Sequence, residues 1–156
     1  MWATALAVTA VGLAAGMLTA DLAHAMPPAG VTTEILGRGT TLAGFKIHVD
    51  GIKVESNNAA GFTVAHMTFA PVGTTGWHVH PGPVLVIVKT GSLTKYSAGD
   101  CIAQTYGAGQ AFVENGPTDE NLVRNDGSVP AETIVTFITP PDTPIRDDPP
   151  PPACNP

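Results

Sequence analysis

Beyond residue 30 the hydrophobic residues of this chain form short runs, and none of these runs has a helical period. Segment 45–54 begins Phe-Lys-Ile-His-Val-Asp, an alternation that places the apolar side chains on one face of a strand. Segment 84–88 is an unbroken Val-Leu-Val-Ile-Val run, which is typical of a buried strand. Turn sequences such as Asp50-Gly51 and Asn125-Asp126-Gly127 separate the runs. The pattern predicts an all-β protein.

The predicted strands follow one another at short intervals, with glycine and proline between them. They cover residues 31–36, 45–54, 62–69, 77–80, 84–88, 92–96, 101–105, 110–114, 121–124 and 133–138. Closely spaced short strands with frequent turns indicate a sandwich or a barrel. The 17 glycines and 15 prolines agree with such a turn-rich protein. We expect a single domain over residues 26–139, because no internal repeat or second domain is visible.

The N-terminal segment has a different character. Residues 3–20 are apolar and rich in alanine, and Ala23-His24-Ala25 has the small-x-small pattern of a signal-peptidase site. We expect residues 1–25 to be a signal peptide. The protein would then be secreted or located in the periplasm or cell envelope, and it would have no membrane attachment after cleavage. An uncleaved membrane anchor is the alternative, since the run is close to the shortest length that spans a bilayer.

The C-terminal segment 140–156 is rich in proline, and we expect it to be an extended tail. It contains Cys154, and the only other cysteine is Cys101. In an oxidising compartment two cysteines indicate a disulfide. That bond would attach the tail to the domain and, in the chain-entropy model, stabilise it by ~4 kcal/mol. Two free thiols or an intermolecular bridge are the alternatives.

Charge and motif content exclude several functional classes. The formal charge is −6 and the lysines and arginines are scattered, so we expect no nucleic-acid binding. The sequence has no GxSxG, P-loop or GxGxxG motif, and neither cysteine has a neighbour that would activate it as a nucleophile.

The strongest candidate site is the pair His78 and His80, in the sequence Gly-Trp-His-Val-His-Pro-Gly-Pro. Residues two apart on a strand project to the same face, so both imidazoles can bind one divalent metal ion. A glycine-containing turn precedes the pair and a valine-rich strand follows it. The alternative interpretation is a pair of barrel-lining histidines hydrogen-bonded to their neighbours.

Segment 62–138 resembles the cupin family. Gly73, His78, His80 and Gly91 match its first motif, with a gap one residue short after Gly73. Gly109 and Asn125 match its second motif if the intervening turn is one residue longer. The local sequence is similar to that of small single-domain bacterial cupins. The resemblance implies a double-stranded β-helix, or jelly-roll barrel.

The resemblance also implies a metal site of three histidines and one glutamate, and this chain departs from it. Val84 stands at the glutamate position and Asn121 at the third histidine position. Replacement ligands are the amide oxygen of Asn121 and the side chains of three further residues: Glu114, Glu120 and His66. The expected cofactor is one divalent ion of Fe, Mn, Ni, Cu or Zn, and the absence of any cofactor is the alternative.

Three functions remain open at this stage. The first is binding of a small molecule, a divalent metal, or both in the barrel. The second is a metal-dependent oxygenase or isomerase that uses the two histidines and a non-standard third ligand, with catalytic residues unknown. The third is a structural or interaction domain without an active site, and the resemblance makes a homodimer plausible. The expected pocket wall is apolar and comprises Trp77, Val84, Val86, Phe112 and Val123.

Overall fold

A computed structural model describes residues 27–154 and 156 of the chain. The predicted signal peptide, residues 1–25, lies outside the described residues. Among the residues described, all the regular elements are β-strands. No helix there is long and apolar enough to cross a membrane.

The strands confirm the all-β prediction and most of the predicted positions. They are β1 (Ala29–Thr40), β2 (Phe45–Val49), β3 (Ile52–Ser56), β4 (Gly61–Thr74), β5 (Val84–Thr90), β6 (Ser92–Ser97), β7 (Ala103–Gly107), β8 (Ala111–Glu114), β9 (Asn121–Arg124) and β10 (Ala131–Thr139).

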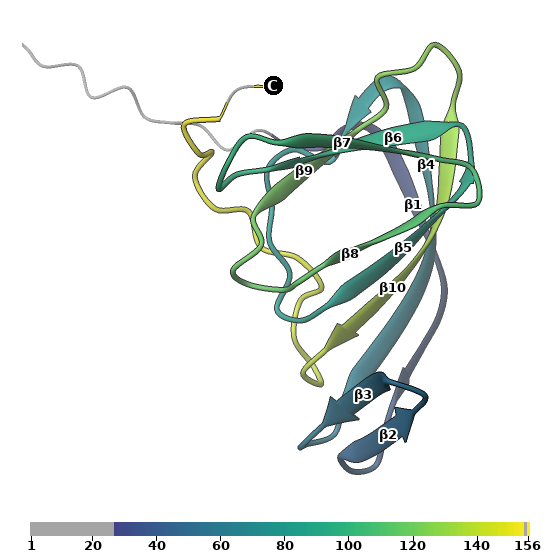
Figure 1. Ribbon diagram of the computed structural model, residues 1–156, viewed down its shortest axis with the longest axis vertical. Coiled ribbons are helices and arrows are strands. Elements are labelled where there is room, and N and C mark those ends of the chain that lie inside the picture. Colours follow the sequence, from purple (N-terminus) through teal and green to yellow (C-terminus); the bar gives the residue numbers. More distant parts are fainter. Residues whose placement is uncertain (1–26, 155) are drawn as a thin grey trace, which may run out of the picture.

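Eight of the strands form one antiparallel sheet that curves into a nearly closed barrel (Figure 1). The strand order is β7-β6-β9-β4-β10-β5-β8, and β1 pairs with β4 beside this path. The long strand β4 pairs with β10 over residues 61–69 and reaches β9 only at Thr74. Its two ends therefore belong to different sides of the barrel, which lets the sheet curve around a central space.

The barrel interior is built by strict alternation along the strands. In β10 the side chains of Ala131, Thr133, Val135 and Phe137 are buried, and the residues between them are half-buried. The valines of β5 and several residues of β4, β8 and β9 complete the same core. Successive side chains of a strand point to opposite faces of the sheet, so every second residue faces the barrel interior.

Segment 45–54 is not one strand but the hairpin β2–β3, which projects from one end of the barrel (Figure 1). Asp50 and Gly51 form its turn with φ values of 49° and 83°. Two successive positive φ values are the signature of a type I′ hairpin turn, which an Asp-Gly pair favours. The predicted alternation of apolar and polar residues is present in both strands, but the turn divides the predicted single strand into two.

Segment 77–80 was predicted as a strand, and this prediction is wrong. His78 instead forms an isolated bridge with Asn121, and Val79 forms one with Asp147. Gly82, two residues after the histidine pair, lies against β10, and a Cβ there would be 2.1 Å from the carbonyl oxygen of Ile138. The absence of a side chain at Gly82 therefore lets this loop pack closely on the barrel wall.

The C-terminal segment returns to the barrel. The predicted disulfide between Cys101 and Cys154 is confirmed, with their Cα atoms 5.6 Å apart. Cys154 is buried against Trp77 and Leu122 in a small cluster separate from the main core. The tail contacts the barrel at two places, through the bridge of Asp147 to Val79 and through the disulfide of Cys154.

Candidate metal and ligand site

His78 and His80 are buried in the barrel, with 3% and 4% of their surfaces exposed. The Nδ1 atom of His78 lies 3.0 Å from the Gly76 carbonyl oxygen, and that of His80 lies 2.5 Å from the Ile145 carbonyl oxygen. A carbonyl oxygen only accepts hydrogen bonds, so Nδ1 is the protonated atom in each ring. Nε2 of each ring is the atom that faces Glu114, and it can bind a metal ion after losing its proton, an arrangement common among histidine ligands.

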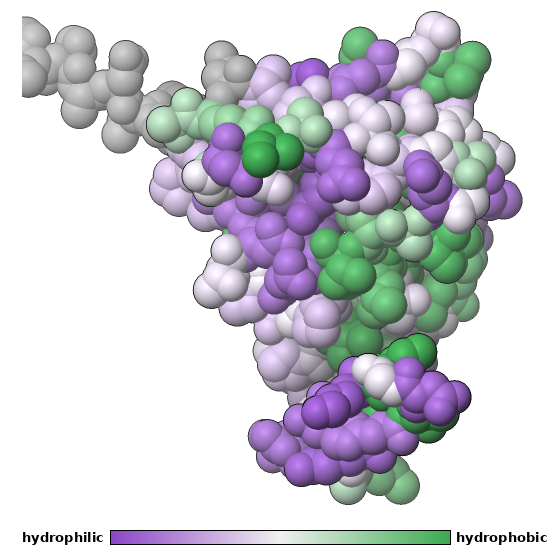
Figure 2. Space-filling model, viewed as in Figure 1, coloured by the Kyte–Doolittle hydropathy of each residue, from purple (hydrophilic) through white to green (hydrophobic). Residues whose placement is uncertain are grey.

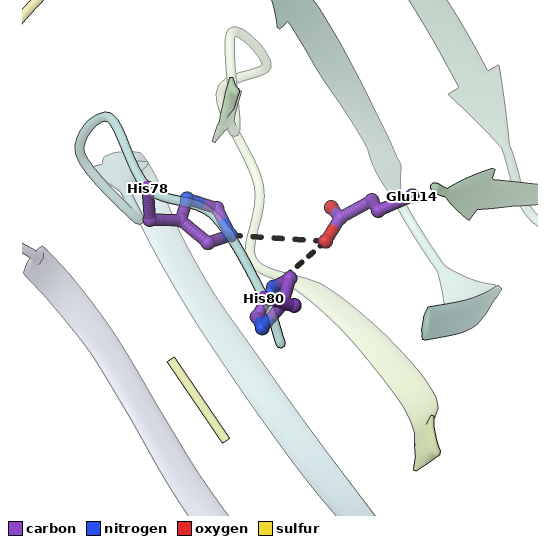
Figure 3. A group of neighbouring side chains, drawn as sticks. All are labelled: His78, His80 and Glu114. Atoms are coloured by element: carbon purple, nitrogen blue, oxygen red, sulfur yellow. Dashed lines mark ion pairs between the residues drawn. The ribbon is translucent and has the colours of Figure 1, made fainter. Parts of the chain in front are cut away.

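Glu114, at the end of β8, completes the group (Figure 3). Its Oε2 atom is 2.9 Å from Nε2 of His80 and 3.8 Å from Nε2 of His78. The carboxylate is as buried as the imidazoles, with 3% of the residue exposed. Both available nitrogens therefore converge on one carboxylate oxygen.

The charge state of Glu114 follows from these neighbours. Burial alone would raise the pKa of its carboxyl group, but the favourable interactions of the carboxylate with the neighbouring His78 and His80 rings lower this pKa to about 2. Glu114 is consequently a carboxylate at neutral pH, which is the form that binds a metal ion.

The strand register explains how Glu114 reaches this position. In the β5–β8 pair Glu114 lies directly opposite Val84, the residue that occupies the usual glutamate position of the cupin motif. Directly opposed residues in an antiparallel pair project to the same face with their Cβ atoms about 5 Å apart. The carboxylate missing from β5 is thus supplied by the neighbouring strand β8. Glu114 was one candidate among four in the sequence, and no local motif distinguished it.

Asn121 is also close to this group. It exchanges two backbone hydrogen bonds with His78, of 2.9 and 3.0 Å, and opposed residues of such a pair share a face. Its amide nitrogen donates to the Asp119 carbonyl at 2.9 Å. Its Oδ1 is buried and has no hydrogen-bond partner among the described residues. A buried amide oxygen without a partner is costly, so this atom has capacity for a further interaction.

Glu120 and His66 are not among the three converging donors, although Glu120 is near enough to His78 for a charge interaction that partly offsets the rise in its pKa caused by burial. Glu120 immediately precedes β9 and borders a surface hollow near Ala98 and Pro152. His66 projects from the outer face of β4, where its Nε2 is 3.0 Å from Glu132 and its Nδ1 is 3.9 Å from Glu34. The structure therefore corrects the hypothesis that His66 faces the histidine pair.

A cavity of about 260 Å³ opens beside the histidines and Glu114. Val84, Val86, Phe112 and Val123 line it, as expected. The expectation for Trp77 is wrong, because this residue alternates away from its neighbour His78 and packs with Leu122 and Cys154. The remaining lining residues are Pro28, Val31, Thr33, Met67, Phe69, Thr75, Leu93, Thr133, Val135, Phe137, Ile145 and Arg146.

Thr133, Ile145 and Arg146 were not recognised from the sequence. Thr133 is fully buried at the cavity wall, and its hydroxyl has no partner among the described residues. The alternation of β10 could have indicated an inward Thr133. Ile145 and Arg146 belong to the proline-rich tail, where no pattern predicts contact with the barrel interior.

The three donors are suited to a divalent metal ion. The two nitrogens and the carboxylate oxygen all lie within 4.8 Å of one another. Ligand atoms about 2.1 Å from a tetrahedral or octahedral ion are separated by roughly 3.0–3.4 Å, and the two measured nitrogen–oxygen distances bracket this range. Two histidines and one carboxylate form a known ligand set with open positions, and here those positions can face the cavity.

Comparisons with known proteins were made at the levels of sequence and structure. No family model matches the chain, and no curated protein is significantly similar to it. An oxalate oxidase structure has 26% identity over 48% of this chain and 40% of its own length, with a TM-score of 0.43. The chain therefore spans well under half of that relative.

Two further solved structures are similar to parts of this chain. A cupin domain from Bordetella pertussis Tohama I has 17% identity, a TM-score of 0.49, and coverage of 74% of this chain and 99% of its own. A sugar phosphate isomerase of the cupin superfamily from Silicibacter pomeroyi has 21% identity, a TM-score of 0.44, and coverage of 51% and 50%.

All three TM-scores are below 0.5, so the fold is identified from the strand pairing and from the position of the histidine motif in the barrel. The chain has the fold of the cupin superfamily, a nearly closed antiparallel β-barrel with two histidines and a carboxylate inside it.

Proposed function

We propose that this protein binds one divalent metal ion through His78, His80 and Glu114, and a small molecule in the adjoining cavity. The observation that carries the proposal is the convergence of both Nε2 atoms on one oxygen of Glu114, while backbone carbonyls satisfy both Nδ1 atoms. Histidines that only fill space in a core do not need Nδ1 bonded to a backbone carbonyl and Nε2 directed at a carboxylate. We further propose Asn121 Oδ1 as a neutral fourth donor, because it is buried, lies opposite His78 and has no hydrogen-bond partner within residues 27–154.

The test is the metal content of untagged protein made in an exporting host, measured by inductively coupled plasma mass spectrometry before and after incubation with Fe, Mn, Ni, Cu or Zn. We expect near-stoichiometric uptake by the wild type and none by His78→Ala/His80→Ala. The control is His48→Ala, whose ring is exposed, pairs with Glu55 and lies outside the proposed site. Equal metal content in the double variant and the wild type would exclude this site.

A metal-dependent oxygenase or isomerase is the second candidate function. It is favoured by the third protein ligand, Glu114, since catalytic metal sites usually have three protein ligands and an open position. The metal would supply Lewis-acid or redox chemistry, while the chain would orient the substrate and exclude water from the cavity. Screening metal-loaded protein against small organic acids and sugars, with oxygen consumption as one readout, tests this candidate.

We propose that the protein acts in an oxidising, extracytoplasmic compartment. The Cys101–Cys154 disulfide supports this location, because such bonds persist mainly outside the cytoplasm. Cleavage after Ala25 remains the expectation of the sequence. N-terminal sequencing of protein recovered from the culture medium or periplasm would test both points.

We also propose that the chain forms a homodimer. In the β2–β3 hairpin, Ile47, Val49, Ile52 and Val54 share one face by register and are 40–68% exposed. Leu85, Ile87 and Val113 form a second exposed apolar group on the outer face of β5 and β8, and Figure 2 shows hydrophobic surface on the barrel beside the hairpin. Patches of this kind mark contact surfaces, and a two-stranded hairpin is marginally stable when uncovered.

A further inference from the structure

The C-terminal segment pairs with the loop that carries the two histidines. Val79, which lies between them, exchanges two backbone hydrogen bonds with Asp147, each 3.0 Å long. Arg146 donates from Nη2 to the carbonyl oxygen of Thr75 at 2.7 Å. Residues 145–147 thus run beside the metal-binding loop in the manner of an added strand.

The same segment orients one of the two histidines. The Ile145 carbonyl accepts the hydrogen bond from Nδ1 of His80, and this contact directs Nε2 toward Glu114. Nδ1 of His78 donates its equivalent bond to the carbonyl oxygen of Gly76, two residues away in the chain. The orientation of His78 is therefore local, whereas that of His80 depends on a segment 65 residues away in the sequence. The side chains of Ile145 and Arg146 also form part of the cavity wall.

The segment has a second attachment at its end, in addition to the hydrogen bonds of residues 145–147. Beyond Asp148 the chain is Pro-Pro-Pro-Pro-Ala-Cys, which cannot form a regular backbone ladder of its own. Cys154 is buried beside Trp77 and joined to Cys101. Arg124 adds one hydrogen bond, from Nη1 to the carbonyl oxygen of Pro156 at 3.1 Å. The disulfide is the covalent link that restrains the tail against the barrel.

We propose that segment 145–154 is a positioning element of the metal site, so that the Cys101–Cys154 disulfide controls the orientation of His80 and, through it, metal affinity. This inference rests on the proposed metal-binding function. Reduction by a dithiol breaks the S–S bond and gives two thiols, while the dithiol is oxidised to its own disulfide. The freed tail would no longer hold the Ile145 carbonyl against His80, whereas His78 and Glu114 would keep their positions.

The experiment compares full-length oxidised wild type with two variants. Cys101→Ser/Cys154→Ser removes the covalent link without leaving thiols that bind metal. Asp147→Pro keeps the disulfide but removes the backbone N–H that Asp147 donates to Val79. The matched control is Thr143→Ala, whose hydroxyl makes only a local bond to the Pro140 carbonyl. Circular dichroism verifies that each variant is folded.

Two readouts are needed. Calorimetric titration with Zn²⁺ or Co²⁺ should show affinity about 10–100-fold lower in both variants, the usual effect of losing an outer hydrogen-bond partner of a metal ligand, and no change in Thr143→Ala. NMR of the metal-free proteins should show the His80 Nδ1 proton protected from solvent exchange in wild type and control, and unprotected in both variants.

The outcomes separate the two proposals. Variants that bind metal as tightly as the wild type and keep a protected Nδ1 proton would overturn the positioning role, while the metal site would stand. A wild type that binds no metal would refute the proposed function and, with it, the link from the disulfide to metal affinity. The proton exchange of His80 would still decide whether the tail positions this ring.

Discussion

Side chains alternate between two faces both in the barrel strands and in the β2–β3 hairpin, but the surroundings of these faces are opposite. In β10 the inward side chains are buried in the barrel, and Thr133 has no exposed surface. In the hairpin, Ile52 lies on the equivalent apolar face and is 68% exposed. Alternation therefore sets which side chains share a face, while the rest of the fold decides whether that face is covered. Side chains of the interior should contribute to stability and function, and those of the hairpin to association.

The largest expected effect concerns the carboxylate of the barrel interior. Glu114→Val should lower Zn²⁺ affinity by more than about 100-fold, because a ligand is lost rather than an outer partner. Val84→Glu/Glu114→Val should restore much of that affinity, since the two residues are directly opposed in the β5–β8 register. Calorimetric titration measures both. If the double variant binds no better than Glu114→Val alone, a carboxylate at position 84 cannot replace the one at position 114, and this hypothesis is wrong.

A second test compares packing in the two regions. Leu93→Ala, at a site with 1% exposure, should lower the free energy of unfolding by about 2–5 kcal/mol through lost burial and a residual cavity. Ile52→Ala in the hairpin should change the monomer by less than about 0.5 kcal/mol. Urea unfolding at low protein concentration gives both values. Similar losses at the two sites would mean that the hairpin is covered within the monomer.

Acidification should affect the metal-free barrel through Glu114. The pKa of this group is lowered from 4.5 to about 2 in the folded state, so the stabilisation it provides is present above about pH 4.5 and is lost as the pH falls toward 2. The difference in unfolding free energy between wild type and Glu114→Gln should therefore shrink over this range. A difference that stays constant from pH 6 to pH 2.5 would contradict the assignment.

The smallest effect on stability is expected at the hairpin, where the readout is assembly. Ile52→Lys should leave the unfolding free energy of the monomer nearly unchanged and shift the chain from dimer to monomer in light-scattering measurements. Lys53→Ala is the matched control, because Lys53 lies on the opposite, polar face beside His48. A wild type that is monomeric at high concentration would remove the proposed homodimer.

The site could be predicted only in part. The spacing of His78 and His80 was sufficient to identify both as candidate ligands, since i and i+2 residues share a face in any extended segment. His66 and Trp77 were misplaced because alternation shows which residues share a face, but not which face is inside. For β4 that choice depends on its pairing with both β1 and β10.

The sequence alone determined the β-rich character, the positions of most strands and the histidine pair, and it favoured the pairing of the two cysteines that the structure confirms. Each depends on local spacing, composition or elimination among few partners. Tertiary structure alone decided that Glu114 is the carboxylate beside the histidines, because strand register joins residues 30 apart in the sequence. It also decided that the Ile145 carbonyl meets His80, since a backbone carbonyl is the same group in every residue and carries no sequence signal.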